Sequence, residues 1–522
     1  MRKFLKSPWA FAVIITVIYF VVNLILTLNH EPYCDEAGTW LFAKSLSITE
    51  MFSLLKADGH PPLFYLILMP FAKLGLPYIT INLVSLAITT LAVLLIVRYA
   101  PFPKWLRVLI IFSPAFTYFI PSFGRDYCLA ALGMALICVT YKNRMTRPIK
   151  YAASIALLFQ SHVVAVPVAG LLALVFLYEH IKAKKINRPF FIGLGLLGLS
   201  FALMALPLLG SLGTHGYLEG SLERGQSSIV AVYQSLFGGN IIVAILLAVF
   251  ALYFLLYILQ YPKQLIIFVG SVAAYLIICE FIYALYKPQQ TAIILQLIMF
   301  VYWTAHYEVT VTKFTKAIKK LFSKLEITKL FLLLVSYPAE KGKRGANFMA
   351  AFMCVPFVFA MPPLVQAAHN DLVHDFSISK TAGQYINENL PEGSVLITGN
   401  EHIASLAIAP FLKDGRVIYD AVLGREMYYM KFDHESFEVL PYTELEQMIA
   451  EKFSGRDNVY YLVAAWTIDE DGLPFYQEES EGAAVEFLSR LELIKEHYDP
   501  NASSEGVIGE SYYAIYKIPA DF

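Results

Sequence analysis

Long apolar segments recur along the first 365 residues of this 522-residue chain, and they limit its fold more than any other feature. About 20 apolar residues are enough for a helix to cross the hydrocarbon layer of a bilayer. The segments cover residues 8–28, 78–97, 108–121, 125–141, 150–178, 190–209, 240–260, 264–286, 289–306 and 346–365. The chain is 57% hydrophobic and 16% charged, whereas soluble proteins are about 45–50% apolar and about 25% charged. The sequence therefore excludes a soluble enzyme and predicts a multi-pass membrane protein.

Basic clusters between these segments predict which loops face the cytoplasm, because lysine and arginine are enriched on that side. The clusters lie at residues 98–107, 142–150, 182–188 and 313–329. If all four clusters are cytoplasmic, segment 150–178 crosses the membrane outward and returns to the cytoplasmic side, with a turn near Gln160–His162. Segment 61–76 then starts and ends outside, so we interpret it as short or re-entrant. The scheme predicts about eleven transmembrane helices, a cytoplasmic N-terminus and an external loop at 29–60.

The alternation of lysine with apolar residues at 313–325 predicts a basic amphipathic helix on the inner membrane surface. The five cysteines show no metal-binding spacing. Cys34 and Cys128 both fall in segments that the scheme places outside. A disulfide between them is one alternative, and two unpaired cysteines is the interpretation that we favour.

Residues 366–522 differ in composition from the rest of the chain. They carry 28 acidic and 10 basic residues, whereas residues 1–365 carry 13 and 30. Candidate helices at 382–390, 401–412 and 442–453 alternate with candidate strands at 394–398, 416–419 and 459–463. This alternation predicts a small α/β domain, and its acidity favours an extracytoplasmic location. The basic residues are confined to short clusters between spans, so nothing indicates nucleic-acid binding.

Two adjacent carboxylates in the first external loop are the first candidate site residues. Asp35 and Glu36 follow the first span within a few residues, in a loop rich in aromatic side chains. A carboxylate at a membrane interface can accept a proton from a hydroxyl group or bind a divalent metal. An arbitrary Asp-Glu pair more often belongs to a solvated acidic loop. The pair alone therefore assigns no function.

Four landmarks occur in a fixed order on one predicted face of the membrane. They are Asp35-Glu36-Ala37, His60-Pro61-Pro62-Leu63, Ser122-Phe-Gly-Arg125-Asp-Tyr127 and Ser161-His162. In these landmarks the chain resembles the GT-C superfamily of multi-spanning glycosyltransferases, in particular the branch of protein O-mannosyltransferases and lipid A aminoarabinose transferases. The resemblance covers residues 1–306 through the landmarks and the rest only in layout. It implies a polytopic all-α membrane domain in residues 1–365 and a small extracytoplasmic α/β domain in 366–522.

The resemblance also implies an activity and roles for particular residues. The family transfers a sugar from a polyprenyl-phosphate donor to an acceptor at the outer membrane face and inverts the anomeric centre. Asp35 matches the family's first-loop catalytic acid and would be the base, with Glu36 as its helper or, in metal-using relatives, part of a metal site. Arg125 matches an arginine that approaches the donor phosphate. The alternatives for Arg125 are a topology charge or a pair with Asp126.

Further candidates match the family less closely. Lys287, at the external end of a late span, corresponds to a basic residue that contacts the phosphate, although ordinary snorkelling also explains it. His60, Tyr127 and His162 are candidates for substrate binding. Their alternatives are hydrogen-bonded structural histidines and an aromatic belt residue. The later external loops show no DxD-type motif, so we expect no essential metal and no other cofactor.

Two other functions remain open from the sequence. A transporter or flippase of lipid-linked sugars would normally place ionisable groups or broken helices near the membrane midplane, often in repeated halves. Here the polar landmarks gather at one face, which favours interfacial chemistry. A non-catalytic envelope assembly protein is the second alternative. The sequence does not choose the sugar, or the acceptor among protein, glycolipid and wall polymer.

Overall fold

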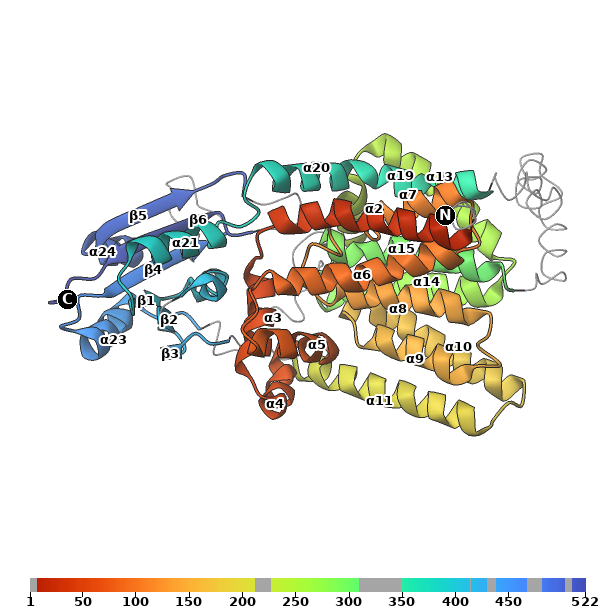
Figure 1. Ribbon diagram of the computed structural model, residues 1–522, viewed down its shortest axis with the longest axis horizontal. Helices are drawn as coiled ribbons and strands as arrows, with labels where there is room; N and C mark the ends of the chain where they lie inside the picture. Colours follow the sequence, from red (N-terminus) through yellow and green to blue (C-terminus); the bar gives the residue numbers. More distant parts are fainter. Residues whose placement is uncertain are drawn as a thin grey trace.

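The computed structural model describes residues 7–211, 227–308, 349–413, 415–429, 438–466, 481–502 and 509–522, so the amphipathic helix expected at 313–325 lies outside the described residues. Figure 1 shows a helical bundle with a sheet domain at one end and the N-terminus at the other. We call these the domain end and the N-terminal end of the bundle.

Seven helical segments of the described chain are long and apolar enough to cross a membrane. They are α2 (Pro8–Asn29), α6 (Thr80–Tyr99), η1 (Val163–Ala165) with α10 (Val166–Lys182), α11 (Arg188–Ser211), α13 (Ile241–Ile258), α14 (Pro262–Phe281), and the segment 349–373 with α19 (Val355–Phe359) and α20 (Met361–Val373). Large apolar side chains on these helices are exposed, for example Ile241 at 72%. A multi-pass membrane protein is thus confirmed, while the count of about eleven spans stays a prediction.

Three further helices complete the bundle interior. They are α8 (Tyr127–Tyr141), α9 (Pro148–Phe159) and α15 (Pro288–Ala305). Every residue of α15 except Ile294 is buried, so this helix packs inside the bundle rather than against lipid. Helix α9 ends at Phe159 and η1 begins at Val163. The predicted turn at Gln160–His162 is therefore confirmed.

The prediction of a helix at 108–121 is wrong beyond Ile111, because α7 (Lys104–Ile111) ends there. Pro114 lacks an N–H group and disfavours helical geometry at Ser113. The chain then runs irregularly to residue 126, and almost all of this segment is buried. Side chains of the surrounding helices pair with its backbone: Asn23 Oδ1 accepts from Tyr118 N at 3.1 Å, Asn82 Nδ2 donates to Ser122 O at 2.5 Å, and Gln296 Nε2 donates to Ala115 O at 2.8 Å. Irregular backbone at membrane depth is stable when the protein itself satisfies it in this way.

Three short helices lie at the domain end of the bundle, between α2 and α6 (Figure 1). They are α3 (Cys34–Ser45), α4 (Ile48–Asp58) and α5 (Leu63–Lys73). Helix α5 has 11 residues and contains Pro70, which makes it too short to span a bilayer. This agrees with the short segment expected at 61–76. One further helix of the bundle, α12 (Ser228–Phe237), is also short.

The C-terminal domain contains a six-stranded mixed sheet in the order β3-β2-β1-β4-β6-β5. Strands β1 (Val395–Thr398), β2 (Val417–Asp420) and β4 (Val459–Ala465) pair in parallel, while β3 (Arg425–Glu426), β5 (Glu492–Tyr498) and β6 (Tyr512–Lys517) pair antiparallel. Its helices are α21 (Ser379–Asn389), α22 (His402–Ser405), η2 (Ala409–Phe411), α23 (Tyr442–Phe453) and α24 (Glu481–Ser489). The predicted strands and helices are confirmed, except that 401–412 forms two short helical turns. Strands β3, β5 and β6 and helix α24 were not expected.

The two parts are joined by contacts at the domain end. The predicted boundary at residues 365/366 falls inside α20, because the last bundle helix continues past its apolar portion to Val373. Cys34 N donates to Glu510 Oε1 at 3.0 Å, and Lys380 Nζ lies 3.3 Å from Glu31 Oε1. All five cysteines, including Cys34, are free. The first loop is therefore held directly by the C-terminal domain.

Basic side chains mark the N-terminal end of the bundle. The Arg98 guanidinium lies over the Trp9 ring at 4.9 Å. Arg144 and Lys263 form ion pairs with Glu179 and Glu308, including Arg144 Nε to Glu179 Oε2 at 2.7 Å and Lys263 Nζ to Glu308 Oε2 at 2.7 Å. These charges come from the ends of α8, α10, α14 and α15 and tie the helices together there.

Candidate active site

Asp35 lies in the first turn of α3, where the Tyr33 hydroxyl, the Cys34 thiol and Lys287 contact its carboxylate. The Tyr33 hydroxyl donates to Asp35 Oδ2 at 3.1 Å, and Lys287 Nζ lies 4.0 Å from the same oxygen. The Asp35 side chain is 37% exposed, so a substrate can reach it. Burial alone would raise the pKa of Asp35, but Lys287, Arg125 and Tyr33 hold this pKa below the usual aspartate value. Asp35 is therefore a carboxylate at neutral pH.

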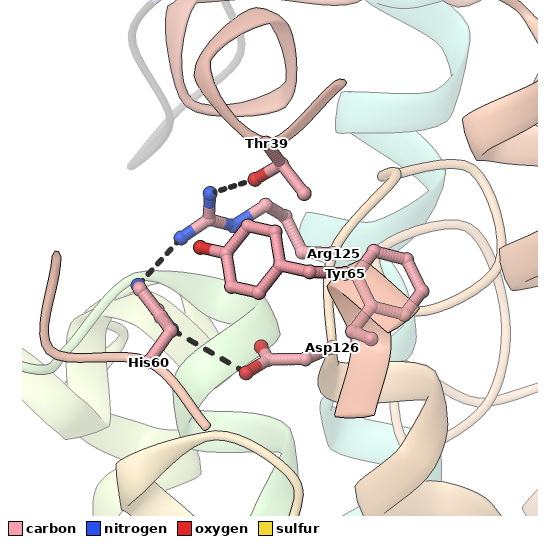
Figure 2. A pocket seen from close by; sticks show the side chains of 6 residues that line it. Thr39, His60, Tyr65, Arg125 and Asp126 are labelled. Carbon is pink, nitrogen blue, oxygen red and sulfur yellow. Dashed lines mark hydrogen bonds and ion pairs between the residues drawn. The ribbon is translucent and has the colours of Figure 1, made fainter. Parts of the chain in front are cut away.

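Arg125 is fixed beside Asp35 by three hydrogen bonds, and Figure 2 shows the two that it makes with Thr39 and His60. Its NH1 group donates to the Asp35 backbone oxygen at 2.7 Å and to Thr39 Oγ1 at 2.6 Å, and its NH2 group donates to His60 Nε2 at 2.7 Å. The irregular segment that precedes α8 carries this arginine, and Ser85 Oγ bonds to its backbone oxygen at 3.2 Å. The segment's departure from helical structure thus brings a cation to the first loop.

A small cleft of about 10 Å³ opens at this point, which is roughly the space that one water molecule needs. Pockets for drug-sized ligands usually measure about 300–1,000 Å³. The cleft is therefore far smaller than such pockets, and a phosphate would enter it only after the lining side chains moved. Its lining combines a guanidinium, a carboxylate, an imidazole, hydroxyl groups and aromatic rings, from Thr39, His60, Phe64, Tyr65, Arg125 and Asp126.

Lys287 reaches Asp35 from the start of α15, some 250 positions later in the chain. Its backbone N–H donates to Gln290 Oε1 at 2.9 Å, which caps the helix and fixes where the lysine side chain begins. The side chain is 42% exposed and lies at the domain end, where Asp35 also lies. Two cations thus lie near Asp35: Arg125 from the irregular segment bonds its backbone oxygen, and Lys287 from the start of α15 lies beside its carboxylate.

Glu36 follows Asp35 directly but is completely buried. Its Oε1 accepts from Asn82 Nδ2 at 2.6 Å and from the Gly124 backbone N–H, and its Oε2 accepts from Tyr33 N at 3.2 Å. His30 Nε2 lies 3.3 Å away. Burial lowers the pKa of His30, but Asp371 and Glu36 raise it to about 10, so this histidine is cationic. Glu36 therefore connects α3, α6 and the irregular segment, and we assign it a positioning role in place of direct contact with substrate.

The hydrogen bond between the Gly124 N–H group and Glu36 Oε1 requires glycine at position 124. A Cβ atom there would lie 2.7 Å from Ile81 Cγ1 and 2.9 Å from Glu36 Oε1, closer than packed atoms approach one another. The absence of a side chain lets the backbone before Arg125 approach the buried Glu36 carboxylate. Close packing against Ile81 and Glu36 therefore explains the glycine in the Ser-Phe-Gly-Arg landmark.

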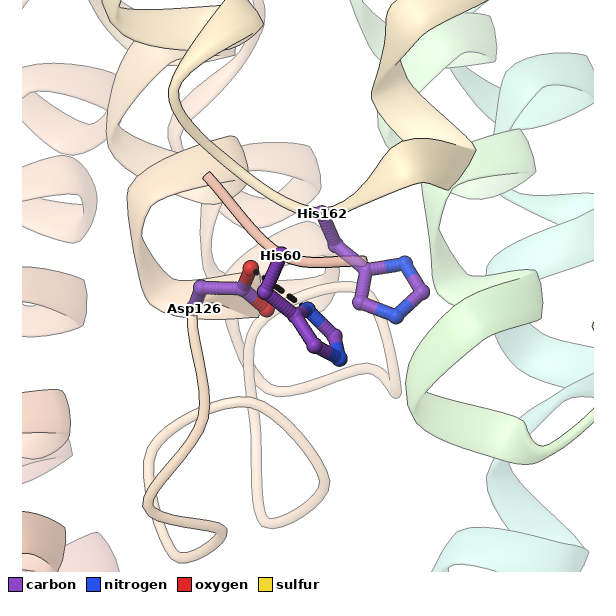
Figure 3. Close-up of side chains that lie close together, drawn as sticks. All are labelled: His60, Asp126 and His162. Atoms are coloured by element: carbon purple, nitrogen blue, oxygen red, sulfur yellow. Dashed lines mark hydrogen bonds and ion pairs between the residues drawn. The ribbon is translucent and has the colours of Figure 1, made fainter. Parts of the chain in front are cut away.

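The other predicted site residues form a second group beside the cleft. His60 Nδ1 lies 3.4 Å from Asp126 Oδ2, and the His60 and His162 rings are 5.2 Å apart (Figure 3). The Tyr127 hydroxyl lies 3.2 Å from His162 Nε2. His60, Asp126 and His162 each offer a ligand atom within 4.8 Å of the others and are the described residues that could hold a metal ion.

Sequence reasoning missed several members of the site. It treated Asp126 only as a possible partner of Arg125, whereas Asp126 pairs with His60. Thr39 and Tyr33 hold Arg125 and Asp35, respectively. The signal for Thr39 was its spacing, because a residue four positions after Asp35 lies one helical turn further along the same face. Nothing in the sequence indicated that Asp126 turns toward His60.

No family model matches the chain, and no curated protein matches it either.

Proposed function

We propose that this chain is a membrane glycosyltransferase that moves a sugar from a polyprenyl-phosphate donor to an acceptor at the outer membrane face, with inversion. The observation that carries this proposal is the partly exposed Asp35 carboxylate with two cations near it: Lys287 Nζ lies 4.0 Å from the carboxylate, and Arg125 bonds the Asp35 backbone oxygen. A base for an acceptor hydroxyl and cations for a phosphate leaving group are what such a transfer requires. The acceptor is a protein, a glycolipid or a wall polymer.

The placement of charge supports the orientation that this activity needs. The basic residues at the N-terminal end, such as Arg98 and Arg144, lie opposite the site. The positive-inside rule then assigns that end to the cytoplasm. The site and the acidic C-terminal domain lie outside the cell membrane in this scheme, where lipid-linked sugars would meet their acceptors.

The reaction follows from the positions of these groups. The acceptor hydroxyl approaches Asp35, which takes its proton as the oxygen attacks the anomeric carbon of the sugar. The bond between that carbon and the phosphate oxygen breaks, and the electron pair stays on polyprenyl phosphate. Two N–H groups of Arg125 make no hydrogen bond to another described residue, so they and Lys287 can receive the phosphate. Glu36 and Thr39 keep α3 and Arg125 in place.

The cations also link the basicity of Asp35 to donor binding. In the free protein they hold the pKa of Asp35 below its usual value, which makes the carboxylate a weak base. A bound phosphate brings negative charge to the same cations and offsets their effect on Asp35. The pKa of Asp35 then rises, so the carboxylate becomes a stronger base when the donor is present.

Binding of the lipid product tests the proposed substrate class. Polyprenyl phosphate should raise the Tm of the purified protein in nanodiscs more than polyprenol, which has the same lipid tail without the phosphate. A ligand at about 100 times its Kd stabilises the folded state by about 2.7 kcal/mol if it does not bind the unfolded state. Equal stabilisation by the two lipids would contradict the proposal.

Replacing Lys287 with Ala should move the acid limb of kcat/KM to higher pH, by up to about one unit. The acid limb of kcat/KM reports the free protein, where Lys287 lowers the pKa of Asp35. With a lowered pKa, Asp35 loses its proton at lower pH, so removing the lysine moves the onset of activity upward. The measurement is kcat/KM between about pH 3.5 and 8. Lys287→Arg keeps the charge and should keep the limb in place, whereas coincident profiles for wild type and Lys287→Ala would refute this link.

A further inference from the structure

We propose that His60, Asp126 and His162 form a binding site for a divalent transition-metal ion of the Zn²⁺ type, which competes with Arg125 for His60. The three side chains come from three separate segments: the loop before α5, the end of the irregular segment, and the turn before η1. Figure 3 shows the three side chains gathered at one place. Their ligand atoms all lie within 4.8 Å of one another.

The kinds of ligand atom match this class of metal. Two imidazoles and one carboxylate are typical protein ligands of catalytic zinc, where a water molecule completes the coordination. Bonds of about 2.0–2.1 Å in a tetrahedral arrangement place ligand atoms about 3.3 Å apart. His60 Nδ1 and Asp126 Oδ2 are already 3.4 Å apart. To supply the third ligand atom, His162 must move closer and give up either the Nδ1 contact with Val164 N at 3.4 Å or the Nε2 contact with the Tyr127 hydroxyl at 3.2 Å.

An unpaired oxygen supplies an independent observation. Asp126 Oδ1 is buried and has no hydrogen-bond partner among the described residues. The Asp126 side chain is only 5% exposed, and a buried charged oxygen without a partner costs free energy. A metal ion would give this carboxylate a second partner. The His60 side chain, 19% exposed and in the lining of the cleft, provides access from the surface.

Arg125 and a metal cannot share His60. Arginine has only N–H donors, so the 2.7 Å contact requires that His60 Nε2 accept the hydrogen bond and that Nδ1 carry the proton toward Asp126. A metal on Nε2 would displace Arg125 directly. A metal on Nδ1 would move the proton to Nε2. The Nε2–H group would then face an N–H group of Arg125, with no acceptor between them. Metal binding therefore separates Arg125 from His60, and removing the arginine should favour the metal.

Direct measurement of bound metal tests this proposal without any assay of sugar transfer. The full chain, carrying a tag that lacks histidine, is stripped with a chelator in nanodiscs and dialysed against Zn²⁺. Wild type should bind one equivalent, and His60→Gln and His162→Gln should weaken binding at least about 100-fold. Arg125→Ala should tighten it at least about tenfold, because a competing cation is lost. Co²⁺ should give visible absorption bands that disappear in the histidine variants.

His374→Gln is the matched control, because His374 is exposed and lies outside the cluster. It should bind zinc as wild type does. The proposal is overturned if wild type binds no zinc, or if folded His60→Gln binds it as tightly as wild type does. Weaker zinc binding in Arg125→Ala would overturn the competition. His60→Gln keeps the test decisive if the more buried His162→Gln fails to fold.

Discussion

Replacing Asp35 with Asn should lower sugar transfer at least about 10³-fold while leaving the fold intact. A general base contributes about 10²–10⁴-fold to a rate, and an amide cannot accept the hydroxyl proton. The Asn side chain has nearly the same shape, and its oxygen can still accept the hydrogen bond from Tyr33. The loss should appear in kcat more than in KM, because the proton moves only in the transition state. Initial rates of donor turnover in nanodiscs, with Tm as the check on folding, measure this effect.

Glu50→Gln is the matched control for Asp35→Asn. Glu50 also lies in the first turn of a short helix at the domain end, α4, so both substitutions remove a carboxylate from a helix N-terminus. Glu50 is exposed and caps its own helix. Its removal should change turnover less than about twofold, since surface substitutions change little. Asp35→Asn with more than a tenth of wild-type turnover would refute the role of Asp35.

Arg125→Ala should reduce kcat/KM by about 10²–10³-fold, the size expected when one donor to a developing negative charge is removed. Arg125→Lys should restore little of this loss. The guanidinium bonds Asp35 O, Thr39 and His60 at fixed angles, and a lysine cannot make these contacts and bind phosphate with the same geometry. The binding advantage of polyprenyl phosphate over polyprenol should also disappear in Arg125→Ala.

Arg98→Ala controls for the loss of an arginine. Arg98 lies at the N-terminal end, against Trp9 and Tyr99, so its removal should leave kcat/KM unchanged within about twofold. If Arg98→Ala and Arg125→Ala lowered activity equally, a general loss of stability would explain both. If Arg125→Lys were fully active, a simple positive charge would suffice and the fixed geometry of Arg125 would have no role.

The sequence predicted those parts of the fold that depend on local patterns. Apolar segments located the long helices, and the polar turn at Gln160–His162 divided one segment into two. The irregular segment from Phe112 to Asp126 was not predictable from hydropathy. Its residues are as apolar as those of a span, but its backbone is satisfied by Asn23, Asn82 and Gln296 from other helices. Such pairing depends on tertiary structure.

The sequence predicted which residues form the candidate site better than it predicted what each residue does there. Asp35, Arg125, Lys287 and His60 lie together, as residues on one predicted face should. Adjacent residues on a helix point about 100° apart, so Asp35 is partly exposed while Glu36 is buried. The sequence pattern cannot tell which of the two carboxylates is exposed. The pairing of Asp126 with His60 also depends on the irregular segment, whose path was not foreseen.

Turnover of a lipid-phosphate sugar by the purified chain is the most direct test of the proposed function. Wild-type protein in nanodiscs is offered a panel of polyprenyl-phosphate sugars without an acceptor, and release of free sugar is followed, because water can slowly replace the acceptor. We expect one donor to be consumed by wild type and Glu50→Gln, and to be left intact by folded Asp35→Asn. If no donor is bound or consumed, or if Asp35→Asn releases the sugar as fast as wild type, the proposed function is wrong.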